Sequence, residues 1–219
     1  MRIGILGSGL MGGKLGTIFT RCGHEVIFSY SRSRQKLKQL AREVGGTSRA
    51  GTPREAAQDA DALLLAVHWS RIDDVLQQAG DLTGKLVVSC SLPMNAGNTA
   101  LLFGQTTSGA EVLGGKLPNA RVVCAFNTIP SEVLLDVYEG SLRTSRRPSL
   151  VYCGDDPPGK KIAATMIRDA GFDPIDAGPL WTARYIEPFA LLVGQLAYQG
   201  DDGPELAYRF ERLGRATTK

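Results

Sequence analysis

Short apolar runs alternate with helix-length amphipathic stretches along most of this 219-residue chain. The apolar runs are rich in Val, Ile and Leu without polar alternation, which is typical of parallel strands covered on both faces. We predict strands at 2–6, 26–30, 62–67, 86–90, 122–126, 150–153 and 172–176. We predict helices between them at 10–22, 34–44, 70–79, 108–117 and 158–170. This order predicts an α/β protein with a Rossmann-type, doubly wound, mostly parallel sheet.

The pattern changes after residue 144, where a loop rich in Arg and Pro begins. We predict a dinucleotide-binding domain at 1–144 and a small C-terminal α/β lobe at 145–219 that ends in helices. The first of these helices spans about 182–198, and a second, short one ends near Leu213. Apolar residues lie on more than one face of the first helix. We therefore expect this small helical C-terminal lobe to close a cleft and to pack on a second subunit.

The composition changes this picture little. Hydrophobic residues make up 43% of the chain and charged residues 21%, as in ordinary soluble domains. A net charge of +3 is too small to indicate a nucleic-acid or membrane partner. The first apolar run ends at Gly7, too early for a signal peptide, and no apolar stretch approaches the roughly 18 residues of a membrane helix. We predict a cytoplasmic protein.

The four cysteines form no Cys-x-x-Cys pair, and three of them lie in predicted strands. Buried, reduced thiols are the expected state. No His or acidic residues stand near them at the spacing of metal ligands, so we expect no metal site.

The first predicted strand runs into Gly7-Ser8-Gly9-Leu10-Met11-Gly12, which matches Gly-x-Gly-x-x-Gly between a strand and a helix. In this motif the first glycine permits a tight turn, the second leaves room for a pyrophosphate, and the third lets the helix pack closely on the strand. The pyrophosphate would lie on free N–H groups at the positive end of the helix. The segment predicts a dinucleotide site.

The end of the second strand distinguishes NADP(H) from NAD(H). NAD enzymes carry a carboxylate there for the ribose hydroxyls, but no Asp or Glu occurs between Glu25 and Glu43. Hydroxyl and cationic side chains stand there instead: Ser31, Arg32 and Lys36. Guanidinium and hydroxyl groups suit a 2′-phosphate. The sequence thus predicts NADP(H), although a solvated helix face remains the alternative for the cations of the next helix.

Three further strand ends should line the same crevice, because ligands of open α/β sheets bind beyond the carboxyl ends of the strands. They carry Val67, His68 and Trp69, the segment 89–94, and Asn127, Ile129 and Pro130. His68 is a candidate acid or base, or part of the wall along the dinucleotide. Trp69 fits an apolar wall. No full acid–base set is evident, which agrees with a hydride transfer that depends mainly on positioning.

The chain resembles the NADPH-dependent reductases of the deazaflavin coenzyme F420. The resemblance rests on the opening segment 1–12, on 23–26 and 126–130, and on two more specific later segments, 153–156 and 176–180. It implies a homodimer with NADP(H) along the strand edge and a deazaflavin stacked on the nicotinamide. It assigns the 2′-phosphate to Ser31 and Arg32, and the cleft floor to Ile129 and Pro130. Where archaeal members carry histidine, this sequence has Asn127.

The resemblance implies hydride transfer between NADP(H) and coenzyme F420. Two alternatives stay open. In one, NADPH reduces a flavin, a ferric chelate or a small imine or carbonyl, since cytosolic domains of membrane ferric reductases are also similar. In the other, the chain is a dinucleotide-binding module without chemistry of its own.

Overall fold

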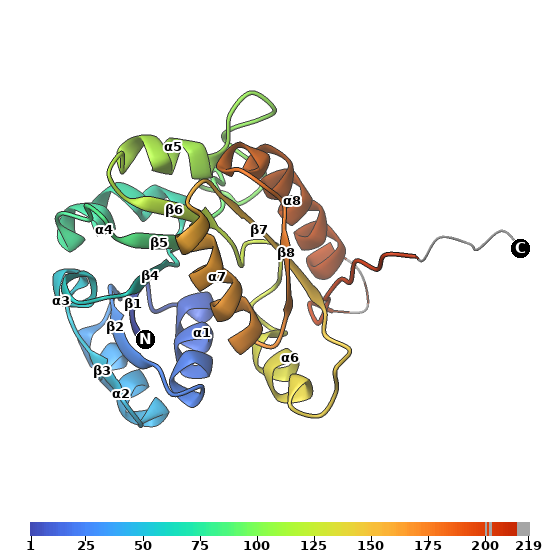
Figure 1. Ribbon diagram of the computed structural model, residues 1–219. Coiled ribbons are helices and arrows are strands. Elements are labelled where there is room, and N and C mark those ends of the chain that lie inside the picture. The colour runs from blue at the N-terminus through green and yellow to red at the C-terminus, as the bar shows by residue number, and fades with distance from the viewer. Residues whose placement is uncertain (200, 202, 214–219) are drawn as a thin grey trace, which may run out of the picture.

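The computed structural model describes residues 1–199, 201 and 203–213, and it contains one eight-stranded sheet with the strand order β3-β2-β1-β4-β5-β6-β7-β8 (Figure 1). The strands are β1 (Arg2–Leu6), β2 (Glu25–Ser29), β3 (Ser48–Ala50), β4 (Ala62–Leu65), β5 (Leu86–Ser89), β6 (Arg121–Cys124), β7 (Ser149–Gly154) and β8 (Asp173–Asp176). The helices are α1 (Leu10–Arg21), α2 (Arg34–Val44), α3 (Pro53–Gln58), α4 (Ile72–Ala79), α5 (Gly109–Lys116), α6 (Leu134–Ser141), α7 (Pro157–Asp169) and α8 (Ala183–Gln199). The expected Rossmann-type architecture is confirmed.

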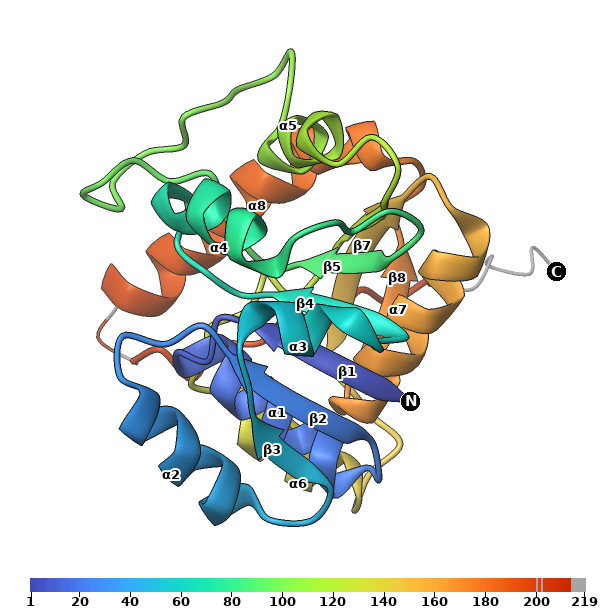
Figure 2. The ribbon, with the colours of Figure 1, turned by 90° about the vertical axis from the view of Figure 1, so that its left-hand side faces the viewer.

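Helices cover both faces of the sheet, which explains why the strands are apolar throughout. Side chains such as Ile5, Phe19 and Phe28 form one core beneath α1, α2, α6 and α7. Leu65, Val75 and Leu113 belong to the opposite core, beneath α3, α4, α5 and α8 (Figures 1 and 2). All of these side chains are fully buried.

Two strands, β7 and β8, run against the other six. Cys124 of β6 pairs with Cys153 of β7 in an antiparallel register, whereas every other neighbouring pair in the sheet is parallel. The apolar run of β7 does not reveal this direction, because a strand buried on both faces has the same composition in either orientation. The chain reaches β7 through α6, which the periodicity did not predict. Strands β7 and β8 of the predicted C-terminal lobe thus extend the same sheet as the N-terminal strands. The domain boundary at residue 144 stays a prediction.

The predicted second helix near Leu213 was wrong, because residues 203–213 are not helical. This segment instead lies against the start of β7, where the carbonyl oxygen of Tyr208 accepts a hydrogen bond from Ser149 N at 2.8 Å. The Tyr208 hydroxyl bonds to Thr128 Oγ1 at 2.7 Å and accepts from Val151 N at 3.1 Å. These tertiary hydrogen bonds satisfy backbone groups that a helix would otherwise satisfy internally.

The two outer strands of the sheet are short and polar. Strand β3 has three residues, and its central Arg49 is exposed. Strand β8 consists of Asp173, Pro174, Ile175 and Asp176, and both carboxylate residues are exposed. Each of these strands pairs with a single neighbour.

Candidate functional site

The turn between β1 and α1 leaves an open space in front of α1. Gly7 has a φ of +112°, and a Cβ on Gly12 would lie 2.0 Å from the Gly7 carbonyl oxygen, so both positions require glycine. A Cβ on Gly9 would meet no heavy atom of the described residues within 4 Å. Within the same residues, no side chain caps α1 at Gly9. The helix therefore presents free N–H groups to an open cradle, which suits an anion.

The end of β2 holds this turn in place. Ser8 N donates to the carbonyl oxygen of Tyr30 at 3.2 Å, and Gly7 N donates to that of Ser29 at 3.2 Å. Tyr30 has a φ of 55°, in the left-handed region that non-glycine residues seldom adopt, and its hydroxyl bonds to Asp74 of α4. Such strain is common at binding sites. Ser31 and Arg32 follow directly, so the β2 end lies beside the cradle.

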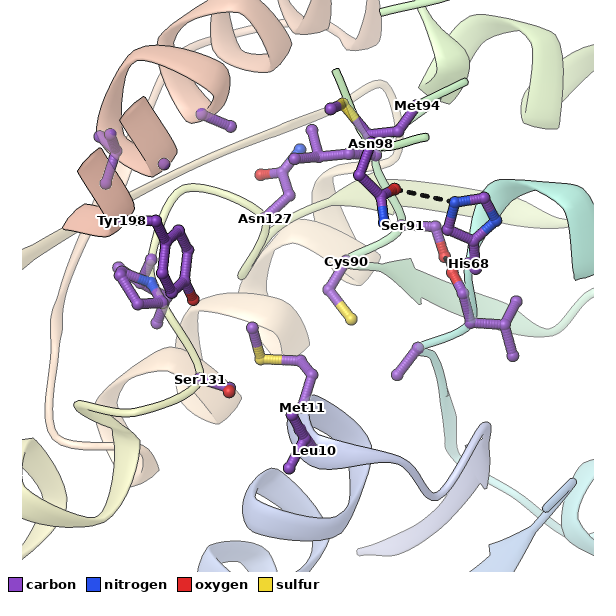
Figure 3. A pocket seen from close by; sticks show the side chains of 18 residues that line it. Leu10, Met11, His68, Cys90, Ser91, Met94, Asn98, Asn127, Ser131 and Tyr198 are labelled. Atoms are coloured by element: carbon purple, nitrogen blue, oxygen red, sulfur yellow. Dashed lines mark hydrogen bonds between the residues drawn. The ribbon is translucent and has the colours of Figure 1, made fainter. Parts of the chain in front are cut away.

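Two cavities extend from this turn. The first, of about 440 Å³, opens beyond the carboxyl ends of β1, β4, β5 and β6 and is bounded on one side by α8 (Figure 3). The second, of about 350 Å³, lies between α1 and α2. Leu10 lines both cavities. Both cavities thus border the start of α1, as one extended ligand would require.

The structure brings most of the residues predicted for the site to these two cavities. The first is lined by Leu10, Met11, Val67, His68, Asn127, Ile129 and Pro130, and the second by Ser8, Gly9, Leu10, Ser31 and Lys36. Gly7 and Gly12 shape the turn itself. Arg32 is exposed and lines neither cavity. Trp69 is also outside both linings, and its ring packs edge-on against Phe103 at 5.7 Å.

His68 is tied to polar neighbours on both sides of its ring. Nδ1 lies 2.9 Å from Ser70 Oγ, and Nε2 lies 2.9 Å from Asn98 Oδ1 in the loop after β5 (Figure 3). Among the described residues, no carboxylate forms a hydrogen bond or an ion pair with either nitrogen of His68. This environment orients the ring without the charged partner that usually activates a catalytic histidine. The contacts favour a wall role over an acid–base role.

Asn127 carries the one buried side-chain oxygen or nitrogen among the described residues that has no hydrogen-bond partner, its Oδ1. Its Nδ2 donates to Cys124 Sγ at 3.1 Å. The residue is 7% exposed and follows Phe126, whose φ is 65°. An unpaired buried acceptor costs roughly 1–3 kcal/mol. Because Asn127 lines the first cavity, a donor on a bound molecule could remove that cost.

The thiols near the site are poor nucleophiles. Burial raises the pKa of Cys90, which lines the first cavity, to about 12. Its neighbour Cys153 and burial together raise the pKa of Cys124 well above its usual range. All four cysteines are free, and Cys124 and Cys153 are buried, as expected. Neutral thiols are weak nucleophiles, so these cysteines give no support to covalent chemistry in this cavity.

An aromatic side chain that the sequence did not single out forms one edge of the first cavity. Tyr198, in the last turn of α8, donates its hydroxyl hydrogen to Glu132 Oε2 at 2.9 Å. Glu132 also accepts from Ser131 Oγ at 3.2 Å, and Lys14 Nζ donates to the Ser131 carbonyl oxygen at 3.0 Å. These bonds join α1, the loop after β6, and α8 around the cavity.

The residues that sequence reasoning missed come mainly from α8: Ala190, Val193, Gly194 and Tyr198. Their apolar spacing indicated a covered helix but not which face meets the strand ends. Cys90, Ser91, Leu92 and Met94 also line the cavity, within the segment that was predicted to reach this edge. Asn98 reaches the cavity from an exposed loop, for which no pattern in the sequence gave a signal.

Over residues 1–199, 201 and 203–213, no cluster of three or more His, Cys, Asp or Glu side chains could hold a metal ion. Among the same residues, no helix has the length and apolar character needed to cross a membrane.

The fold and the glycine turn together define a Rossmann-type dinucleotide-binding protein, with a cavity at the switch from β1 to β4. Residues 2–93 match the family described as NADP oxidoreductase, coenzyme F420-dependent. The match lies within the N-terminal part of the chain.

Individual proteins are also similar to the chain. The chain is 30% identical over 148 residues to the F420-dependent NADP reductase of Methanocaldococcus jannaschii, covering 64% of each protein. It is 29% identical over 190 residues to metalloreductase STEAP3 of Rattus norvegicus, covering 87% of this chain but 36% of that protein. A crystal structure from Arthrobacter sp. FB24 superposes with a TM-score of 0.84 at 23% identity, covering 97% of this chain and 100% of that one. The last match shows the fold alone.

Proposed function

We propose that this chain binds NADP(H) and exchanges a hydride between it and coenzyme F420 in the first cavity. The observation that carries the proposal is the path marked by the two cavities that border Leu10, from the β2 end past the open Gly9 cradle to the strand ends. The archaeal relative named as an F420-dependent NADP reductase supports the choice of acceptor.

The residues along this path fit a phosphorylated dinucleotide. The N–H groups at the start of α1 would hold the pyrophosphate beside Gly9. Ser31 and Lys36, with the exposed Arg32 nearby, would hold the 2′-phosphate. The unpaired Asn127 Oδ1 would accept a hydrogen bond from a donor on the ring end of the ligand. When bound, the reduced dinucleotide supplies a hydride to the acceptor.

The protein's part in such a reaction is positioning and exclusion of water. Met11, Ile129, Pro130 and Val193 give the first cavity apolar walls, which keep water from the reacting carbon atoms. His68 is held by Ser70 and Asn98 and contributes a polar wall. The reduced acceptor also takes up one proton, which water can supply, so the reaction requires no side-chain acid. This agrees with the lack of an acid–base pair among the lining residues.

The test is a spectrophotometric assay of the purified protein with NADPH and oxidised coenzyme F420, run beside FMN and a ferric chelate. Rapid NADPH-dependent bleaching of the deazaflavin, with little reaction of the other acceptors, is the expected result. Turnover of FMN or ferric chelate alone would overturn the F420 assignment.

A second function has specific support, because the chain aligns over 87% of its length with part of a metalloreductase. In that case NADPH would reduce a flavin or a ferric chelate in the same cavity. The chain spans 36% of that relative, so this activity is likewise a proposal. Tight NADPH binding without turnover of any acceptor would instead indicate a binding module without chemistry.

A further inference from the structure

The apolar cavity carries a single phenyl ring among its described lining residues, that of Tyr198. Figure 3 shows Tyr198 and His68 on opposite sides of the cavity, with Cys90 between them. The dinucleotide of the proposed function enters past Leu10, which lines both cavities, and Val67 stands next to His68 in the chain. The space beside Tyr198 is therefore left for the second substrate.

Three hydrogen bonds fix the Tyr198 ring relative to this space. Its hydroxyl donates to Glu132, Glu132 accepts in turn from Ser131, and Lys14 holds the Ser131 carbonyl oxygen. The side chain of Tyr198 nevertheless remains accessible, since the residue is 59% exposed. An anchored but accessible aromatic ring is suited to stacking against a planar ligand, because little side-chain freedom is lost when the ligand binds.

The hydroxyl of Tyr198 is already used in the hydrogen bond to Glu132. Burial, together with the Glu132 carboxylate, raises the pKa of Tyr198 to about 12. Burial by itself would raise the pKa of Glu132, but hydrogen bonds from Tyr198 and Ser131 lower it overall. The pair thus keeps a neutral donor and an ionised acceptor through the physiological range, and the ring is the part of Tyr198 that is available to a substrate.

We propose that the ring of Tyr198 is the platform on which a planar, fused-ring hydride acceptor stacks, so that Tyr198 selects deazaflavins and flavins over acceptors without such a ring. This inference rests on the proposed function and identifies the residue that sets its substrate class. Tyr198 acts as a specificity-determining residue and takes no part in proton transfer.

The experiment measures dissociation constants of oxidised coenzyme F420 and of FMN by their fluorescence, in the presence of saturating NADP⁺. Tyr198→Leu is expected to weaken binding of the ring compound about tenfold, as loss of an aromatic stack does. Tyr198→Phe keeps the ring but not the anchor, so a loss of about threefold is expected. Phe210→Leu is the matched control, because Phe210 is a similarly exposed aromatic residue outside α8 and does not line the cavity.

The affinity for NADPH should be unchanged in all three variants. Unchanged F420 or FMN binding in Tyr198→Leu would overturn the inference. An equal loss of NADPH affinity would also overturn it, because Tyr198 would then support the cavity as a whole. Wild-type protein that binds FMN but not F420 would overturn the F420 assignment alone, and the Tyr198 comparison would be made with FMN. Failure to bind either compound would overturn both proposals.

Discussion

The three glycines of the turn after β1 meet different physical requirements. A Cβ on Gly7 would clash with Ala66 and Val67 after β4, and one on Gly12 would clash with the Gly7 carbonyl oxygen, whereas Gly9 faces open space. From the sequence alone, the role of each glycine could be assigned only by analogy with the motif. The contacts show that the fold requires glycine at positions 7 and 12, whereas only a bound ligand would require it at position 9. This separation can be measured.

Gly9→Ala is expected to lower the free energy of unfolding by no more than about 1 kcal/mol, because its Cβ would meet no described atom, although alanine is a poorer N-cap than glycine. It should weaken NADPH binding tenfold or more by occupying the pyrophosphate cradle. Gly12→Ala, the matched control, should lower the free energy of unfolding by about 1–3 kcal/mol through overpacking. Urea unfolding and NADPH fluorescence titration measure the two effects. Normal NADPH affinity in Gly9→Ala would show that no pyrophosphate lies there.

Arg32 tests the choice of dinucleotide. It is exposed at the end of β2, and no ion pair of Arg32 is recorded within the described chain. A charge-assisted contact to the 2′-phosphate is worth roughly 1.5–3 kcal/mol, so Arg32→Ala should raise the dissociation constant of NADPH about tenfold or more. NADH, which lacks this phosphate, should be little affected. Lys38→Ala on the exposed face of α2 is the control, and equal losses for both dinucleotides would make Arg32 a scaffold residue.

At the scale of secondary-structure elements, α8 is fastened to α5 by a buried carboxylate. The two oxygens of Glu187, which is 2% exposed, accept hydrogen bonds from Gly109 N at 2.8 Å and Ala110 N at 2.9 Å. Glu187 thus caps α5 from another helix, where the positive end of the helix favours an anion. Arg184 makes a second, bidentate link to Glu111 of α5.

The Glu187 contact should make stability depend on pH. Burial raises the pKa of Glu187 from 4.5 to about 7, against the effect of its two N–H partners. Because the folded-state pKa is the higher one, this stabilisation is fully present below about pH 4.5 and is lost as pH rises through 7. Between pH 5 and pH 8, the free energy of unfolding of the wild type should therefore fall by roughly 2 kcal/mol more than that of Glu187→Gln. Urea titrations at both pH values, with the exposed Glu43→Gln as control, test this. Equal declines in wild type and Glu187→Gln would contradict it.

The limits of prediction at this scale have physical causes. The long apolar or amphipathic elements, such as β1 and α2, were placed within a residue or two because burial dictates their composition. Strand β3 and helix α3 were missed, since a three-residue strand with one apolar residue and a six-residue helix carry too little periodicity. The glycine turn and the β2 end could be predicted because local motifs encode them. Tyr198 could not, because its position depends on how α8 packs across the sheet.

At the scale of the whole molecule, α8 has two different faces. Ala190 and Val193 line the first cavity, whereas Tyr185, Leu192 and Leu196 are each more than half exposed. Exposed apolar groups repeated along one helix are typical of a surface that another protein covers. We propose that a second copy of this chain covers this face, as the family resemblance implies.

Sedimentation equilibrium should accordingly give a mass near twice the 23.5 kDa of the chain. Leu192→Glu, which places a charge on the outer face of α8, should shift the mass toward the monomer. Leu142→Glu is the matched control, since Leu142 is 71% exposed at the end of α6, on a different part of the surface. A monomeric wild type, or a dimer that tolerates Leu192→Glu, would rule this interface out.

The outer strands of the sheet bear on how copies of the molecule can associate. Strand β8 lacks one backbone donor at Pro174, and it carries Asp173 and Asp176, whose charges would repel a second β8 strand laid alongside. Strand β3 offers only three residues to an incoming strand. The sheet is therefore a poor template for further strands at either end. Folded copies of the chain should therefore neither join their sheets edge to edge nor grow into fibrils by adding strands. Ordered association is expected to use the helices on the surface instead.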